Sequence, residues 1–304
     1  MEKFDVNILG CGSATPTLQH HPSSQVVNVR EKLFMIDCGE GTQLQFRKSR
    51  LRFGRLNRIF ISHLHGDHCF GLIGFISTLA LLGRTGDIYI HAHADLENIL
   101  QPQLDYFCRD NPFKVIIEPF SPTQNEIIYE DKSVKVSTIP LLHRIPCAGF
   151  LFQEQPKDAH LIADMIKFYN IPVKELANIK KGADFVKEDG TVISNRRLTR
   201  PAEPARSYAY CSDTAYSKKI VPIIENADLL YHEATFMEEG AHRAKQTGHS
   251  TAKQAAEIAK AANVKKLILG HFSARYNDNT ALLEEAKSIF PNTILANEQL
   301  CEKL

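Results

Sequence analysis

The chain has 304 residues, of which 43% are hydrophobic and 23% are charged, and its formal net charge is +1 at pH 7. This composition is ordinary for a globular protein, and a charge so close to neutral excludes a globally basic coat for nucleic acid. Apolar runs are too short to cross a bilayer, and the N-terminal residues lack the basic and apolar regions of a signal peptide. We therefore expect a cytoplasmic protein without a membrane partner, in which any nucleic-acid contact comes from local patches.

The seven cysteines are scattered, odd in number and never arranged as a C-x-x-C pair. That pattern favours reduced thiols in a cytoplasm over a disulfide framework or a cysteine-type zinc site. Cys69 directly follows a cluster of histidines, and we interpret it as a small buried side chain rather than a metal ligand.

The first half of the chain predicts short strands. Their segments are rich in Val, Ile and Phe and are punctuated by Gly, Pro and Ser. One longer apolar stretch, residues 71–82, predicts a helix. The predicted strands are 5–9, 25–29, 33–37, 58–62, 87–91, 114–118 and 134–139.

The second half predicts alternating strands and helices. Thr251, followed three residues later by Gln254, predicts a capping box at the start of one helix. Strands first and then β–α alternation predict an α/β fold in which two mixed sheets stack between outer helices. The predicted strands are 207–211, 229–231 and 266–269, and the predicted helices are 217–225, 251–262 and 280–290.

Residues 153–206 break this alternation, because they are polar and contain four prolines. Residues 159–169 predict a short amphipathic helix, and Asp-Gly in the middle of 185–193 predicts a small hairpin. A loop of this length is uncommon without a function. We expect one domain over residues 1–304 that carries an inserted, protruding arm at 153–206, rather than two domains.

The most informative segment is residues 62–68, Ser-His-Leu-His-Gly-Asp-His. His63 and His65 alternate, so in extended geometry their side chains point the same way. The following glycine permits a tight turn that brings Asp67 and His68 back towards the same space. Crowding three imidazoles and a carboxylate is unfavourable unless a cation holds them, so this density predicts a site for two metal ions.

Three further donors stand where predicted strands lead into loops, namely His143, Asp213 and His271. Together with the histidine cluster they are sufficient for two cations. Asp213 is the natural bridge, because its two oxygens can each bind one metal. Imidazole and carboxylate ligands favour two zinc ions, and manganese or iron also suit an N/O site.

A basic segment, residues 47–58, carries six basic residues and no acidic one and leads directly into the histidine cluster. A charge run is usually a solvated face, but beside a hydrolytic metal site it favours a grip on backbone phosphate. Arg50, Arg52 and Arg55 are the candidate contacts.

Five blocks of sequence, taken with the candidate ligands, resemble the ribonuclease Z family of the metallo-β-lactamase superfamily nearly end to end. The resemblance implies an αβ/βα sandwich with a binuclear zinc site at the sheet edges. It also implies an endoribonuclease that removes the 3′ trailer from precursor tRNA, leaving a 3′-hydroxyl on the tRNA and a 5′-phosphate on the trailer. The blocks are residues 9–16 (Leu-Gly-Cys-Gly-Ser-Ala-Thr-Pro), 36–43 (Ile-Asp-Cys-Gly-Glu-Gly-Thr-Gln), 232–235 (His-Glu-Ala-Thr), 249–251 (His-Ser-Thr) and 271–276 (His-Phe-Ser-Ala-Arg-Tyr).

The resemblance also assigns ligands residue by residue. Asp67 is implied to be a ligand and the proton acceptor as well. The set implied for one zinc is His63, His65, His143 and Asp213, and the set implied for the other is Asp67, His68, Asp213 and His271.

His249 is our candidate for the proton donor to the leaving 3′-oxygen, because pairing with the carboxylate of Glu233 would raise the pKa of its imidazole. The alternatives are a purely structural His249 before a helix and a Glu233 that supports the metal site. Arg275, close to the ligand His271, is a candidate contact to the scissile region, and its alternative is a structural arginine bonded to nearby carbonyls.

The family's arm projects from one subunit of a homodimer and clamps the elbow of the tRNA, so the resemblance implies these properties too. Lys180 and Lys181 lie in a block that resembles the family's arm, and they are candidate RNA contacts. The family usually has a Gly-Pro-rich stretch in the arm, whereas residues 173–178 of this chain read Val-Lys-Glu-Leu-Ala-Asn.

Other functions use the same metal cluster. One is hydrolysis of C–O or C–N bonds, as in a lactonase, thioesterase or β-lactamase, and another is a phosphodiesterase for small molecules. A third is a non-catalytic nucleic-acid-binding module. The basic segment, the arm and the blocks around Glu233 and His249 favour RNA cleavage.

Overall fold

The computed structural model describes residues 2–304, which form two compact units. The larger unit contains the chain up to Gln153 together with Arg206–Leu304, and the smaller one contains Glu154–Ala205. None of the helices within residues 2–304 is long and apolar enough to cross a membrane.

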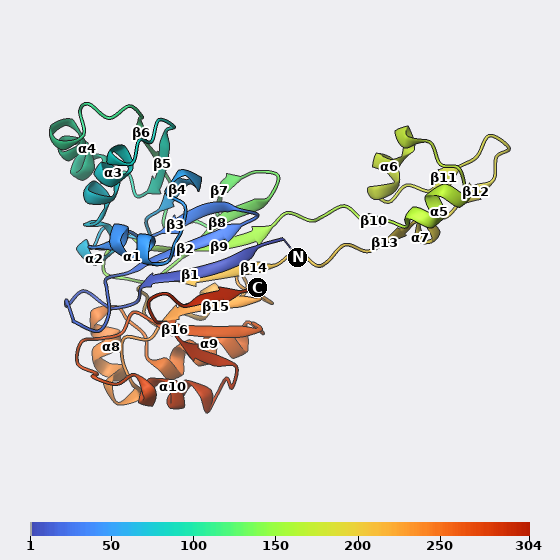
Figure 1. Ribbon diagram of the computed structural model, residues 1–304. Coiled ribbons are helices and arrows are strands. Elements are labelled where there is room, and N and C mark those ends of the chain that lie inside the picture. The colour runs from blue at the N-terminus through green and yellow to red at the C-terminus, as the bar shows by residue number, and fades with distance from the viewer. Residues whose placement is uncertain (1) are drawn as a thin grey trace. The chain divides into compact units, whose positions relative to one another are not determined.

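The larger unit is built on two seven-stranded mixed sheets (Figure 1). The first has the order β18-β1-β2-β3-β4-β5-β6. Neighbours from β18 to β3 pair antiparallel, and neighbours from β3 to β6 pair in parallel. Its strands are β1 (Phe4–Gly10), β2 (Ser24–Val29), β3 (Lys32–Ile36), β4 (Leu56–Phe60), β5 (Ile88–Ala92), β6 (Val115–Pro119) and β18 (Cys301–Lys303).

The second sheet has the order β17-β16-β15-β14-β9-β8-β7. Neighbours from β14 to β17 pair in parallel, whereas β9 runs antiparallel to β14 and β7 antiparallel to β8. Its strands are β7 (Ile127–Glu130), β8 (Val134–Pro140), β9 (Ala148–Glu154), β14 (Ser207–Cys211), β15 (Leu229–Glu233), β16 (Lys266–Gly270) and β17 (Thr293–Leu295).

Helices cover the outer faces of both sheets, so the predicted sandwich of two mixed sheets between helices is confirmed (Figure 1). Beside the first sheet lie α1 (Thr42–Lys48), α2 (Gly66–Cys69), α3 (Leu72–Leu81) and α4 (Leu96–Phe107). Beside the second lie α8 (Ala241–Thr247), α9 (Ala252–Ala261) and α10 (Thr280–Lys287). Short 3-10 helices occur at Phe53–Arg55, Lys218–Ile220 and Glu238–Gly240.

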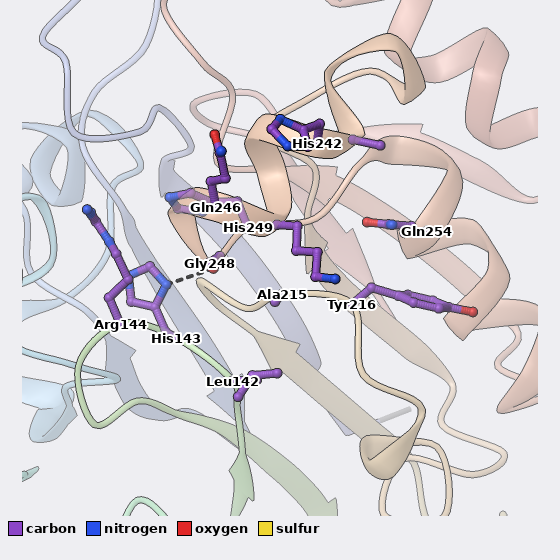
Figure 2. Close-up of a pocket in the computed structure, with 12 residues that line it drawn as sticks. Leu142, His143, Arg144, Ala215, Tyr216, His242, Gln246, Gly248, His249 and Gln254 are labelled. Carbon is purple, nitrogen blue, oxygen red and sulfur yellow. Dashed lines mark hydrogen bonds between the residues drawn. The ribbon is translucent and has the colours of Figure 1, made fainter.

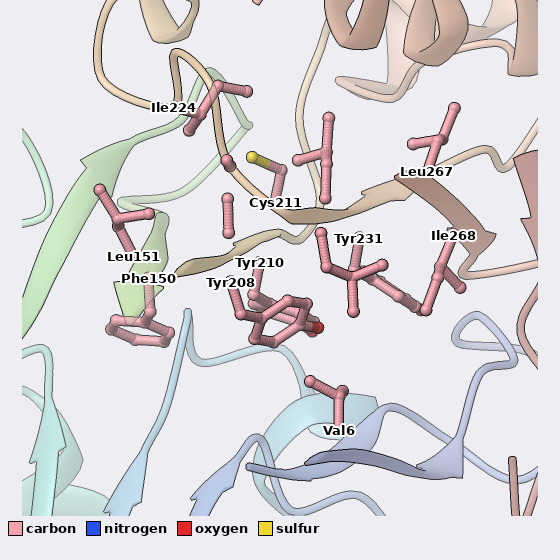
Figure 3. Packing of buried hydrophobic residues seen from close by; sticks show 14 of the residues in the cluster. Val6, Phe150, Leu151, Tyr208, Tyr210, Cys211, Ile224, Tyr231, Leu267 and Ile268 are labelled. Carbon is pink, nitrogen blue, oxygen red and sulfur yellow. The ribbon is translucent and has the colours of Figure 1, made fainter. Parts of the chain in front are cut away.

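The main hydrophobic core fills the space between the two sheets and continues beneath α9 and α10. Figure 3 shows Tyr208 and Tyr210 on the face of β14 that looks towards Val6 of the first sheet, whereas Cys211 points to the opposite face. This alternation follows from the two-residue period of a strand. The buried Tyr210 hydroxyl donates a hydrogen bond to Asp37 Oδ2 (2.6 Å), which ties the second sheet to the end of β3.

Local sequence signals were reliable at some helix ends and misleading at others. The capping box is confirmed, since the Thr251 side chain accepts from Gln254 N–H and the Gln254 side chain accepts from Thr251 N–H. The predicted helix 217–225 is wrong, because only the 3-10 turn Lys218–Ile220 forms there. Proline at position 222 has no N–H to donate to the carbonyl four residues earlier, which disfavours continuation of the turn into a longer helix.

The smaller unit has its own core, made by four buried side chains from segments spread over the unit. The predicted hairpin is confirmed, because Phe185–Val186 (β11) pairs with Val192–Ile193 (β12) around a glycine of positive φ. The predicted helix 159–169 is shorter, because His160–Leu161 (β10) pairs with Thr199–Arg200 (β13) instead. The core residues are Ile171, Ile179, Ile193 and Leu198, and the helices are α5 (Ala163–Phe168), Val173–Glu175, α6 (Leu176–Lys180) and α7 (Asn195–Leu198).

Residues 173–178, which depart from the family's Gly-Pro-rich pattern, form the 3-10 turn and most of α6. All six residues therefore lie in helical turns, with no glycine or proline among them. That this unit is an RNA-binding arm of a single domain stays a prediction.

Candidate metal centre

The candidate ligands gather at one edge of the sandwich, because each follows a strand that ends there. The loop after β4 carries His63 and His65, and the loop after β8 carries His143. Asp213 follows β14, and His271 follows β16. Clefts at the carboxyl ends of parallel strands are a common place for sites in α/β proteins.

One group consists of His63, His65, His143 and Asp213, whose ligand atoms all lie within 4.8 Å of one another. His65 Nδ1 is 3.0 Å from His63 Nε2 and 3.3 Å from His143 Nε2. Asp213 Oδ2 is 3.6 Å from His63 Nε2 and 3.8 Å from His143 Nε2. These separations are those of atoms that share one cation.

A second group consists of Asp67, His68 and His271, and it is completed by the other oxygen of Asp213. Asp213 Oδ1 lies 3.5 Å from His68 Nε2 and 3.1 Å from His271 Nε2. Asp67 Oδ2 lies 3.4 Å and 3.5 Å from the same two nitrogens. Asp213 therefore faces one group with Oδ1 and the other with Oδ2, which is the arrangement of a bridging carboxylate.

The nitrogens that face this space fit a metal. The Nε2 atoms of His68 and His271 are buried and have no hydrogen-bond partner. The opposite nitrogens are held, because His68 Nδ1 lies 2.7 Å from Asp37 Oδ2 and His271 Nδ1 lies 3.0 Å from Thr235 Oγ1. Metal-bound histidines in proteins are oriented in this way by a bond at the other ring nitrogen.

Two histidines of the first group, His63 and His143, are held at Nδ1 in the same way. His63 Nδ1 lies 3.0 Å from Ser62 Oγ, and His143 Nδ1 lies 2.7 Å from the carbonyl oxygen of Gly248 (Figure 2). Cys69 is buried and its thiol donates to the carbonyl of His65, as expected for a structural side chain.

Electrostatics at the centre also favour cations. Burial lowers the pKa of the His63, His65 and His143 imidazoles, so these rings are neutral and keep a lone pair for a ligand bond. Burial alone would raise the pKa of Asp213, but His271 and His68 hold it well below its usual range. Carboxylates crowd around His68, and although burial opposes its charge, Asp37 and its neighbours raise the pKa of that ring.

Asp37 is the supporting residue that sequence reasoning did not single out. It is fully buried at the end of β3 with a φ of 55°, and it accepts from the backbone and hydroxyl of Ser62 as well as from His68 and Tyr210. Its only signal in the sequence was its place in the block 36–43, directly after a predicted strand.

His249 and Glu233 form a buried pair beside the centre. Glu233 is inaccessible to solvent, and its Oε1 lies 2.8 Å from His249 Nδ1. Glu233 also accepts from Thr214 N–H (3.0 Å) and from the Thr235 hydroxyl (2.7 Å), so its position is fixed. Burial opposes charge on His249, but Glu233 outweighs it and raises the pKa of the imidazole to about 9. His249 therefore carries a proton at neutral pH.

A cleft of about 340 Å³ opens over the centre. Arg275 lines it, with its guanidinium 4.8 Å from the centre of the Phe236 ring and its Nε 3.1 Å from Ser273 Oγ. Arg144 and Arg243 line the same cleft, and sequence reasoning missed both. Arg144 is next to the ligand His143 in sequence, which could have indicated it, whereas Arg243 had no local signal.

The residues of the basic segment lie elsewhere. Arg50, Arg52 and Arg55 are exposed and do not line this cleft, and Arg55 pairs with Glu31 at 3.4 Å. Arg58, at the end of the segment, is bonded to Glu118 at 2.8 Å. Contact of the first three with RNA stays a prediction. Lys180 and Lys181, which belong to the smaller unit, are both exposed.

The chain is similar to known proteins over its whole length. The family model described as anti-Pycsar protein Apyc1 matches residues 4–177. A ribonuclease Z from Bacteroides fragilis is 59% identical over 304 residues, which cover 100% of both chains. The crystal structure of the short form of human tRNase Z matches with a TM-score of 0.70 and 26% identity, covering 98% of each chain. The metallo-β-lactamase fold protein YhfI from Bacillus subtilis matches with a TM-score of 0.69 and 20% identity, covering 100% of each, which is a likeness of fold.

Proposed function

We propose that this protein is a metal-dependent endoribonuclease that processes the 3′ end of precursor tRNA. The premise is its family: the chain belongs to the ribonuclease Z family, and it also belongs to the family whose model matches residues 4–177. The observation that best supports a metal-dependent reaction is the position of Asp213, whose two oxygens face two separate groups of ligand atoms. That arrangement supports two metal ions, and the N/O donors favour zinc.

The ligands divide between the two ions as the geometry groups them. His63, His65 and His143 would hold one with Asp213, and Asp67, His68 and His271 would hold the other with the same aspartate. When bound, a pair of zinc ions supplies positive charge for phosphate oxygens and lowers the pKa of water to about 7.

The chain's own residues would then move two protons. Asp67, which lines the cleft and remains ionised because His68 and His271 lower the pKa of its carboxyl, accepts a proton from the attacking water. His249 donates one to the 3′-oxygen that leaves. Its Nδ1 is bonded to Glu233, so Nε2 is the nitrogen that faces the substrate. The products are a 3′-hydroxyl on the tRNA and a 5′-phosphate on the trailer.

The test is incubation with a precursor tRNA that carries a 3′ extension, with and without a chelator, followed by mapping of the cut and its end groups. We expect metal-dependent cleavage next to the tRNA body with a 3′-hydroxyl. Failure to cut RNA, together with turnover of a lactone or a small phosphodiester, would favour a small-molecule hydrolase instead.

The smaller unit is proposed to bind the tRNA. It has exposed lysines at the end of α6 and a core of its own, so it can present a stable surface. Deleting residues 171–192 should weaken cleavage of precursor tRNA far more than hydrolysis of a small phosphodiester. Equal losses for the two substrates would refute this role.

A homodimer and a cytoplasmic location complete the proposal. The first rests on the family alone, and the second is also favoured by the free cysteines. Sedimentation of the purified protein tests the first, because a monomer at micromolar concentration would contradict it. Cell fractionation tests the second.

A further inference from the structure

A second cavity lies beside the metal centre and shares His249 with the cleft. Its volume is about 710 Å³, within the range of small-ligand sites. His143, Arg144 and His249 line both this cavity and the metal centre or its cleft. The remaining lining comes from α8 and Gly248 at its end, from Gln254 of α9, and from the loops that follow β8 and β14. None of the ligands from the second metal group lines it.

The walls of this cavity combine apolar and cationic groups. Figure 2 shows Leu142, Ala215 and Tyr216 on the side of the two loops, opposite His242 and Gln246 of α8. The Tyr216 ring packs against the main core, which fixes it as a flat surface. Arg144 and Lys245 line the cavity, and neither has an ion-pair partner among residues 2–304.

Two amide side chains also line the cavity, Gln246 and Gln254. The Oε1 atom of Gln254 accepts from Thr251 N–H in the capping box, so its amide NH₂ is the group left for a ligand. Gln246 adds a second amide. An aromatic face, two unpaired cations and two amides together suit a nucleoside with a phosphate: a ring to stack on, a charge to neutralise and base edges to bond.

The position of His249 decides which nucleoside would enter. In an in-line displacement the attacking and leaving oxygens lie on opposite sides of phosphorus. Asp67, the proposed proton acceptor, lines the cleft and not the second cavity, whereas His249, the proposed proton donor, lines both. The leaving 3′-oxygen therefore faces the second cavity, and it belongs to the last nucleoside of the tRNA body.

We propose that this cavity is the subsite for the last nucleoside of the tRNA body, with its base stacked on Tyr216 and its 5′-phosphate held by Arg144 and Lys245. This inference rests on the proposed function. It adds that the enzyme binds the base of the nucleoside whose 3′-oxygen leaves. Stacking on a ring does not require any particular base.

The test begins with the unaltered enzyme and three precursor tRNAs: one unmodified, one abasic at the last nucleoside of the body and one abasic at the first trailer nucleoside. We expect kcat/KM to fall about 5- to 150-fold for the first abasic substrate, the range given by loss of one stacked base, and to change little for the second. Equal cleavage of all three, or a loss confined to the trailer substrate, would overturn the subsite.

Substitutions then locate the contact. Tyr216→Leu should lower kcat/KM for the unmodified substrate to about the abasic level. It should add little on the abasic substrate, because the base and the ring act as one pair. Tyr216→Phe keeps the ring, so its kcat/KM for the unmodified substrate should match that of the unaltered enzyme. If Tyr216→Leu and the abasic change lower kcat/KM independently, base stacking on Tyr216 is wrong, and measured metal content shows that the variant is intact.

The phosphate contact has its own control. Lys245→Ala should lower the slope of log(kcat/KM) against log[salt] by about one, as for one lost phosphate contact. Lys260→Ala, an exposed lysine in the last turn of α9 that lines neither cavity, should not change it. Equal slopes for Lys245→Ala and the unaltered enzyme would overturn the contact. No cleavage of the unmodified precursor would overturn the proposed function itself, whereas cleavage indifferent to the base overturns only the subsite.

Discussion

Replacing Asp37 by Asn tests how the metal centre is held in shape. The buried carboxylate accepts hydrogen bonds from Ser62 N–H (2.8 Å), Ser62 Oγ–H (3.0 Å), Tyr210 Oη–H (2.6 Å) and His68 Nδ1–H (2.7 Å). An asparagine has one acceptor oxygen in place of two, and its NH₂ would face donors. Oδ1 accepts one of these bonds and Oδ2 accepts three, so one contact is lost if the NH₂ replaces Oδ1 and three if it replaces Oδ2, and every bond that remains is to a neutral amide.

The magnitude follows from the kind of contact. A hydrogen bond to a charged group contributes about 1.5–3 kcal/mol, and breaking a buried ionic contact costs about 3–5 kcal/mol. We therefore expect Asp37→Asn to lower the free energy of unfolding by about 3–5 kcal/mol. The bond from His68 also orients a metal ligand, and loss of such a bond lowers metal affinity about 10- to 100-fold. The affected ion should be the one bound by Asp67, His68 and His271.

Urea unfolding and competition with a chelator of known affinity measure the two effects on the same metal-loaded protein. Tyr210→Phe is the matched control, because it removes one donor and leaves the bond between Asp37 and His68 in place. It should cost about 1.5–3 kcal/mol, as for one hydrogen bond to a charged group, and leave metal affinity unchanged. If Asp37→Asn binds both metal ions as tightly as the unaltered protein does, Asp37 does not position His68 and the reasoning is refuted.

Three further changes test other parts of the molecule. His249→Ala should keep the metal content but lower cleavage about 10²- to 10⁴-fold through loss of a general acid, and metal content that falls in step with activity would contradict the acid role. Chelation should lower the melting temperature, because metal ions that bind the folded site and not the unfolded chain stabilise the fold, and identical melts with and without chelator would speak against metal binding. Burial opposes the ionised form of Glu298, but His20 Nδ1 at 3.1 Å and His21 N–H at 2.8 Å hold its pKa below the usual value. The ionised carboxylate therefore stabilises the fold above about pH 4.3, and this contribution is lost as the pH falls through the folded-state pKa. Glu298→Gln should unfold in less urea at pH 7 and approach the unaltered protein in acid, whereas a difference that is constant with pH would refute it.

The basic segment shows why a pattern of charge predicts less than a pattern of ligands. Six basic residues in a row of twelve indicated a phosphate grip. In the structure Arg58 is stacked between Tyr89 and Tyr129, with 4.5 Å and 4.2 Å to the ring centres, and it bonds to Glu118. A long side chain can turn to partners on other strands, so its role depends on tertiary neighbours that the local sequence does not name.

The sequence by itself determined the dense part of the metal centre, because the ligands from His63 to His68 lie in one short segment whose geometry follows from a strand and a turn. The capping box of α9 and the hairpin of the smaller unit were equally local. Only the tertiary structure decided what supports and surrounds those ligands. Asp37 reaches His68, and Tyr216 stands across a cavity from α8, because the order of strands in two sheets brings the ends of β3, β4, β8, β14 and β16 to one edge. Contacts between residues far apart in the chain depend on that order, and no local pattern encodes it.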